Sequence, residues 1–176
     1  MKLIVFFSWQ SDIDNDKLNN KKFLCNCINS ALKKIENKGE LKNVFFEFQE
    51  STSNISGNPS IPNTLDKRIE NCDIFIADLS IVDSYSRLEL FLRKLRKAKT
   101  KRGPNNNAFG EYNKALASHC DEQVITIMNY LNGNPKDNNN LIPFDARERR
   151  FPIGYLLKSD KDIILRIGLF SSEIFC

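Results

Sequence analysis

The residue best suited to catalysis in this chain is Glu111, which lies near the start of a helical pattern. If Asn107 is the N-cap of that helix, Glu111 lies close to its positive end, where an ionised carboxylate is favoured. An ionised carboxylate in a cleft can stabilise the oxocarbenium ion that forms when an N-glycosidic bond breaks. The alternative is that Glu111 complements the helix dipole on a solvated surface.

Five other side chains are candidates for binding a substrate. Trp9, the only tryptophan, follows the first apolar segment, and it could stack on a base or nicotinamide ring or cover the core instead. Asp12 and Asp78 could hold ribose hydroxyls, and their structural alternatives are a turn aspartate and a helix cap, respectively. Ser8 precedes Trp9 at the end of the first apolar segment. Ser80 follows Asp78, and the two could orient a ribose together.

Several common catalytic and metal-binding systems lack their residues within these 176 positions. His119 is the only histidine, which excludes sites that need two His ligands, and its neighbour Cys120 is not placed for a dyad. The five cysteines form no Cys-x-x-Cys pair, so we expect reduced, mostly buried thiols and no metal site. The sequence has no Walker A motif and no Gly-x-Gly-x-x-Gly, which are the usual glycine-rich motifs for phosphate binding. Arg147, Arg149 and Arg150 could bind phosphate or pair locally with acidic neighbours.

The elements that must position these residues alternate between strand and helix patterns. Apolar, β-rich runs predict strands at 2–8, 43–49, 73–79 and 123–128, and a short fifth strand at 141–144. Apolar residues at helical spacing predict helices at 23–38, 61–72, 87–102, 108–118 and 160–174. This alternation predicts a flavodoxin-like α/β sandwich, with a parallel sheet of four or five strands covered on both faces. Ligands of such sheets bind beyond the carboxyl ends of the strands, where we expect the candidate residues to gather.

Composition and charge narrow the class of protein further. The apolar share is 41% and the charged share 27%, which favours a folded domain and excludes general disorder. No apolar run is long enough to span a bilayer and no secretory signal is recognisable, so we expect a cytoplasmic protein. Residues 87–102 hold eight Lys or Arg side chains against Glu89 alone. That segment could bind nucleic acid, an acidic partner or membrane phosphates, or it could be the solvated face of a helix packed on the sheet.

Four segments in this order resemble a known family: FFSWQSD, GNPSIPNTLDKRIENCDIFIADLS, PNNNAFGEYNKALA and LIPFDARERRFPIGY. They are similar to motifs of the bacterial TIR-like (Toll/interleukin receptor-like) predicted nucleotide-binding proteins. The similarity covers roughly residues 3–155. It implies a TIR-type fold over residues 1–157, with a basic helical insertion at about 83–103 and a C-terminal helical tail at 158–176.

The resemblance also implies an activity and a set of site residues. Many members cleave NAD at the nicotinamide–ribose bond, by hydrolysis or by cyclisation of ADP-ribose, and serve in anti-phage defence. NAD is then the substrate, and no separate cofactor is implied. Glu111 matches the catalytic glutamate of the family. The residues that match its first- and third-strand motifs are Ser8, Trp9, Asp12, Asp78 and Ser80.

Two other functions remain open at this point. TIR-like domains also act as non-catalytic modules that bind a nucleotide, self-associate or dock on a separate sensor or effector protein. A nucleoside deoxyribosyltransferase is the third hypothesis, because such enzymes use a glutamate in a similar helix on a similar fold. NAD cleavage needs no general acid, since nicotinamide leaves from a ring nitrogen that already carries a positive charge.

Overall fold

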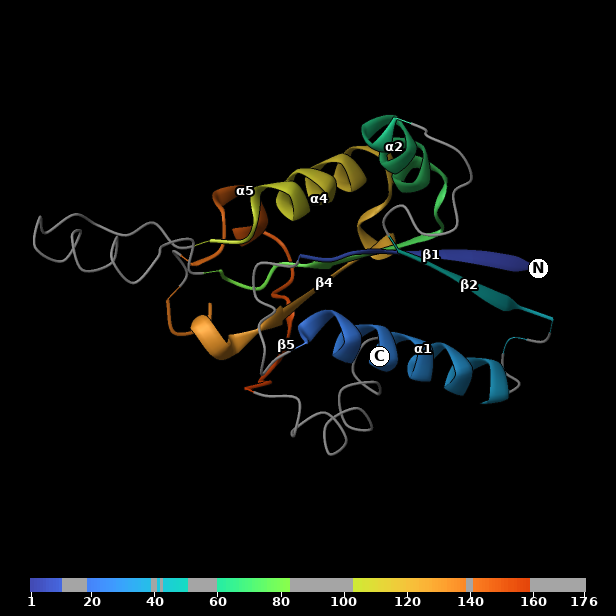
Figure 1. The fold of residues 1–176 in the computed structure, drawn as a ribbon, viewed down its shortest axis with the longest axis horizontal. Helices are drawn as coiled ribbons and strands as arrows, with labels where there is room; N and C mark the ends of the chain where they lie inside the picture. Colours follow the sequence, from blue (N-terminus) through green and yellow to red (C-terminus); the bar gives the residue numbers. More distant parts are fainter. Residues whose placement is uncertain are drawn as a thin grey trace, which may run out of the picture.

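The computed structural model of the chain describes residues 1–10, 19–38, 41, 43–50, 60–82, 103–138 and 141–158, without the side chains of 144 and 145. Its centre is a five-stranded, all-parallel sheet with the order β2-β1-β3-β4-β5 (Figure 1). The strands are β1 (Lys2–Ser8), β2 (Phe45–Glu50), β3 (Ile74–Asp78), β4 (Val124–Asn129) and β5 (Ile153–Tyr155). This order is the flavodoxin-like one, so the predicted fold class is confirmed.

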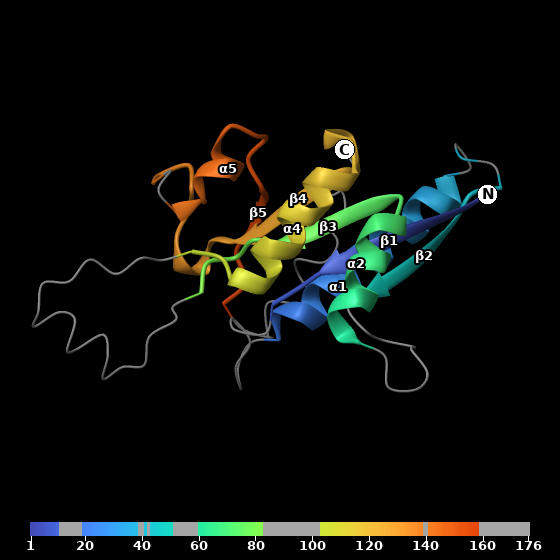
Figure 2. The same ribbon diagram turned by 90° about the horizontal axis from the view of Figure 1, so that it is seen from above.

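Helices cover both faces of the sheet and make three layers. One face carries α1 (Asn20–Lys38), and the other carries α2 (Ile61–Asn71), α4 (Asn106–Ser118) and the short α5 (Phe144–Arg147). Figures 1 and 2 show α1 on the side of the sheet opposite to α2 and α4. Two 3₁₀ turns, η1 (Asp121–Gln123) and η2 (Tyr130–Asn132), flank β4.

The core has two halves, one on each face of the sheet. Val5 and Phe7 of β1 point toward α1, whereas Phe6 between them packs with α2 and α4, as the two-residue period of a strand requires. The apolar face expected for α1 is buried as predicted, and its buried apolar members are Phe23, Leu24, Cys27, Ile28, Ala31 and Leu32. β1 is apolar on both of its sides because each face of the sheet is covered by helices, and α1 buries its apolar side against one of these faces.

Two sequence-based predictions of local structure are wrong. Residues 141–144 are not the fifth strand, because Pro143 is the N-cap of α5 and the carbonyl of Ile142 accepts a hydrogen bond from Arg147 Nε at 2.8 Å. The fifth strand is β5, which pairs with the end of β4. The N-cap of α4 is Asn105 rather than Asn107, and its side chain accepts a hydrogen bond from the backbone N–H of Asn107 at 2.7 Å.

Several predicted features lie outside the described residues. They are Asp12, the basic segment 87–102 within the expected insertion, and the terminal helix at 160–174. In the described part of the chain, no helix combines the length and apolar character needed to cross a membrane. The described cysteines are all free thiols. Burial raises the pKa of both Cys25 and Cys27 to about 12, which keeps these thiols protonated at neutral pH.

Candidate active site

A pocket of about 230 Å³ opens where β1 ends, beside the β1–β3 boundary at which the strand order reverses. Open parallel sheets bind their ligands at such a switch point. The lining residues come from the end of β1, from α2 and from the start of α4: Phe7, Ser8, Trp9, Gln10, Leu65, Asn105, Asn107 and Glu111. The fold therefore brings together three of the six predicted site residues, Ser8, Trp9 and Glu111.

A larger pocket, of about 610 Å³, lies elsewhere and holds none of the six predicted site residues, although Arg149 and Arg150, which could bind phosphate, line it. It is lined by the first residues of three strands, Ile74, Val124 and Ile153, together with side chains that include Asp121 and Arg149. The amino ends of parallel strands are not where open α/β sheets bind their ligands. The described residues contain no cluster of three His, Cys, Asp or Glu side chains that could hold a metal ion.

Glu111 is half-buried in the second turn of α4. Burial raises the pKa of its carboxyl group, and the nearby Ser8 hydroxyl and Lys114 ammonium offset part of that shift. Desolvation therefore outweighs the contacts that favour the ionised form, so the pKa moves in the direction opposite to the one expected from the helix terminus alone. Glu111 is thus a desolvated carboxylate, more basic than one in water.

Two buried polar atoms of pocket-lining residues have no hydrogen-bond partner among the residues that the structure describes. They are the hydroxyl oxygen of Ser8 and the indole nitrogen Nε1 of Trp9, and Ser8 is only 1% exposed. The Ser8 hydroxyl acts on the pKa of Glu111 without reaching full hydrogen-bond geometry with the carboxylate. A buried polar group without a partner costs free energy, and such groups are rare in native proteins. Adjacent unpaired groups in one pocket are what a ligand with matching polar atoms would satisfy.

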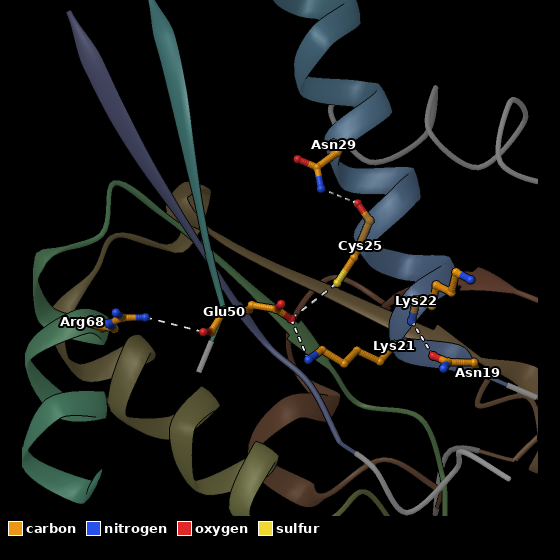
Figure 3. Close-up of polar contacts among 7 residues, drawn as sticks. All are labelled: Asn19, Lys21, Lys22, Cys25, Asn29, Glu50 and Arg68. Atoms are coloured by element: carbon orange, nitrogen blue, oxygen red, sulfur yellow. Dashed lines mark hydrogen bonds and ion pairs between the residues drawn. The ribbon is translucent and has the colours of Figure 1, made fainter. Parts of the chain in front are cut away.

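Trp9 is held from the side of α1. The Lys21 ammonium lies 4.1 Å from the centre of the Trp9 ring and forms an ion pair with Glu50 Oε2 at 2.9 Å. Figure 3 shows Lys21 and Cys25 pointing from α1 toward the Glu50 carboxylate. Arg68 of α2 donates to the Glu50 carbonyl at 3.5 Å from the opposite side. Trp9 thus contacts the Lys21 ammonium and also packs against the core cluster on the α1 side, so it covers the core as well as lining the pocket.

The structure places Asp78 and Ser80 outside the pocket lining. Asp78 is 1% exposed, and Oδ1 accepts hydrogen bonds from the backbone N–H and the hydroxyl of Ser80. Oδ2 of Asp78 accepts a hydrogen bond from Asn20 Nδ2 at 3.0 Å. The ribose-binding role predicted for these two residues therefore has no support in their placement, since both are engaged inside the protein.

Asn20 and Asn129 extend this set of contacts into a buried polar network. The side-chain oxygen Oδ1 of Asn20 accepts hydrogen bonds from the Tyr155 hydroxyl at 2.7 Å and from Asn129 Nδ2 at 3.2 Å. The Ser80 hydroxyl accepts one from the backbone N–H of Asn129 at 2.7 Å. Asn20 begins α1, whereas Asp78, Asn129 and Tyr155 end β3, β4 and β5. The network therefore ties the carboxyl ends of three strands to the start of α1.

Sequence reasoning did not predict several of the pocket residues as part of a site. Gln10 and Asn105 had no assigned role, Asn107 was expected only as a helix N-cap, and Leu65 only on an apolar helix face. Three consecutive asparagines before a helix are a signal for a cap, since Asn is among the preferred N-cap residues. That signal indicates the start of the helix, but which asparagine faces a pocket depends on the tertiary structure.

Comparison with known proteins adds little to this description. No family model and no curated protein matches the chain. Among solved structures, the chain is similar to the 2-desoxiribosyltransferase from Leishmania mexicana, with 15% identity, a TM-score of 0.45, and coverage of 94% of this chain and 97% of that chain. So distant a likeness does not bear on activity. The fold and the site define a flavodoxin-like α/β protein with a carboxylate pocket at its switch point.

Proposed function

We propose that the protein cleaves the N-glycosidic bond between a ribose and a base, with Glu111 as the carboxylate that acts on the ribose. The observation that carries the proposal is the presence, in one pocket, of a desolvated carboxylate and two buried atoms, Ser8 Oγ and Trp9 Nε1, that have no partner in the described part of the chain. The sugar hydroxyls and ring atoms of a nucleoside can form hydrogen bonds with Ser8 Oγ and Trp9 Nε1. Its C1′ carbon, which becomes cationic during cleavage, can interact with the Glu111 carboxylate.

The chemistry follows from the burial of Glu111. When the bond from C1′ to the base nitrogen breaks, the electron pair leaves with the base and C1′ becomes an oxocarbenium ion. A carboxylate that is poorly solvated in the free pocket interacts more favourably with that cation than one already surrounded by water. The stabilisation is therefore larger in the transition state than in the ground state, which is the condition for catalysis. Water or another acceptor then forms the new bond to C1′.

NAD is the first substrate that we propose, on the resemblance to TIR-like proteins. Nicotinamide leaves as a neutral molecule, so the reaction needs no proton donor, and Trp9 in the pocket lining would contact the ring. The resemblance also supports a role in defence and activation by self-association or by a separate sensor protein.

A 2′-deoxynucleoside is the second candidate, and the pocket volume favours it. The pocket, at about 230 Å³, lies below the range of roughly 300–1,000 Å³ typical of sites for drug-sized ligands. This volume suits a base with its sugar better than a whole dinucleotide. Transfer of deoxyribose to a second base would use the same carboxylate.

The test is a parallel assay of the purified, concentrated protein on both substrates. One arm contains NAD, with and without a crowding agent, and the other contains deoxyinosine with adenine as acceptor. Chromatography then follows free nicotinamide, linear and cyclic ADP-ribose, hypoxanthine and deoxyadenosine. We expect turnover in one arm, loss of that turnover in Glu111→Gln, and normal turnover in Glu70→Gln.

Glu70→Gln is the matched control because Glu70 is an exposed glutamate of α2 outside the pocket. Turnover by Glu111→Gln at the rate of the wild type would contradict the role of Glu111. An inert wild type in both arms, with nucleotide still bound, would instead establish the non-catalytic binding module.

A further inference from the structure

We propose that Gln10 is a positioning residue, whose side-chain amide fixes the start of α4 against the ends of β1 and β3 and so places Glu111. The inference rests on the proposed function, in which Glu111 acts on the substrate. Gln10 is 3% exposed and lies two residues beyond the end of β1. Its amide nitrogen donates to the carbonyl oxygen of Ser80, and its amide oxygen accepts from the backbone N–H of Asn105 at 2.9 Å.

These two hydrogen bonds join three elements that meet at the pocket. Ser80 follows the end of β3, and Asn105 is the N-cap of α4, so one side chain links both to the end of β1. Asn105 passes this constraint to the helix, because its own side chain accepts from the backbone N–H of Asn107 at 2.7 Å. Gln10, Asn105, Asn107 and Glu111 all line the pocket. A shift of the α4 start would therefore change the pocket wall and the carboxylate together.

A neighbouring contact, made by the chain just before α4, does not replace the Gln10 amide. It is a backbone bridge in which the N–H of Val82 donates to the carbonyl of Gly103 at 3.2 Å. That bridge joins α4 to the chain beyond β3, but it makes no connection to β1, where Ser8 and Trp9 lie. Gln10, by contrast, ties the β1 side of the pocket to the helix side.

Only an uncharged amide of this length satisfies both partners. A glutamate would place a carboxylate oxygen against the Ser80 carbonyl, which has no proton to share. An asparagine is one methylene shorter and could not reach both groups. Gln10→Glu and Gln10→Ala therefore both break the link, and the first does so with little change in volume.

Gln123 provides a matched control because it makes the same pair of hydrogen bonds elsewhere. Its amide nitrogen donates to the carbonyl of Asp73 at 3.1 Å, and its amide oxygen accepts from the backbone N–H of Cys120 at 3.0 Å. This pair links the start of β3 to the turn before β4, beyond the far end of α4 and outside the pocket lining. Gln123→Ala thus removes the same kinds of bond without touching the pocket.

The experiment compares the folded full-length variants Gln10→Ala, Gln10→Glu and Gln123→Ala by steady-state kinetics. Because small displacements of catalytic groups are costly, we expect both Gln10 variants to lower kcat by about 10- to 100-fold, with a smaller change in KM. We expect Gln123→Ala to keep kcat within about twofold, since such a variant loses only stability. Equal losses of kcat in Gln10→Ala and Gln123→Ala would overturn the proposal.

Two further readouts keep the test independent of the proposed function. Trp9 is the only tryptophan, so its fluorescence reports on the pocket alone, and the pKa of Glu111 can be followed by carbon NMR. Since burial is the main cause of the raised pKa of Glu111, we expect Gln10→Ala to lower that pKa and to shift the Trp9 emission. We expect Gln123→Ala to change neither. If the wild type is inert, these signals still decide whether Gln10 positions the helix, and two unchanged signals in Gln10→Ala would refute it.

Discussion

Asn20→Ala should be among the most destabilising single substitutions in this chain. The Asn20 side chain is fully buried and makes three hydrogen bonds within the network at the strand ends. It donates to the Asp78 carboxylate and accepts from Asn129 and Tyr155. Alanine removes all three bonds, and no solvent reaches this position to replace them.

The expected size of the effect follows from these contacts. A hydrogen bond to a charged group contributes about 1.5–3 kcal/mol, and each neutral one contributes about 1 kcal/mol. Asp78 keeps its bonds from Ser80, so its carboxylate retains part of its stabilisation. The substitution should therefore lower the free energy of unfolding by about 3–5 kcal/mol. This is a large share of the total of about 5–15 kcal/mol typical of a domain.

Urea unfolding followed by circular dichroism at pH 7 measures this difference. The control is Asn29→Ala on the same helix, where the Asn29 amide donates to the Cys25 carbonyl one turn earlier, at 2.8 Å, its one hydrogen bond within the described residues (Figure 3). We expect the control to stay within about 0.5 kcal/mol of the wild type, as alanine also has the better helix propensity. A loss in Asn20→Ala no larger than in the control would refute the reasoning about the network.

Two other predictions concern Glu111 and the glycines. Burial raises the pKa of Glu111 in the folded protein above its ordinary value of 4.5. The protonated carboxyl group therefore adds to the free energy of unfolding below pH 4.5, and this contribution is lost as the pH rises through the raised pKa. Glu111→Gln should therefore become more stable relative to the wild type between about pH 4 and pH 7 in urea titrations, and an unchanged difference would contradict the burial of the carboxylate. A Cβ at Gly154 would lie 2.0 Å from the Tyr130 ring, so Gly154→Ala should cost about 1–3 kcal/mol. In Gly110→Ala, the new Cβ in α4 would meet nothing within 4 Å, so this variant should gain up to about 1 kcal/mol of stability. Thermal melts should therefore show a lower Tm for Gly154→Ala and a higher Tm for Gly110→Ala, and shifts in the same direction would contradict the packing at these two glycines.

The parts of the fold that the sequence predicts well are those set by local periodicity. The first strand and the buried face of α1 appear where their apolar patterns place them. The sequence does not distinguish the last strand from a second short apolar run nearby. The run at 141–144 contains Pro143 and the run at 153–155 follows Pro152, so neither has the stronger strand pattern. Only long-range pairing separates them, since the second run lies beside β4, where Gly154 leaves room for the Tyr130 ring.

The candidate site divides in the same way. Parallel topology alone brings Ser8, Trp9 and Glu111 to one pocket, and this could be predicted from the order of the elements. The inward position of Asp78 could not, because its partner Asn20 lies 58 residues away in the chain. A rim aspartate that faces a ligand and one that faces internal amides have the same local sequence.

The most direct test of the central claim separates binding from chemistry in Glu111→Gln. The measurement is the rate of base release by this variant, together with its dissociation constant for the substrate found in the parallel assay. If Glu111 stabilises the cation that forms only in the transition state, the rate should fall by about 1,000-fold or more while the affinity changes by less than about tenfold. A variant that binds weakly but releases the base at the rate of the wild type would contradict the assignment.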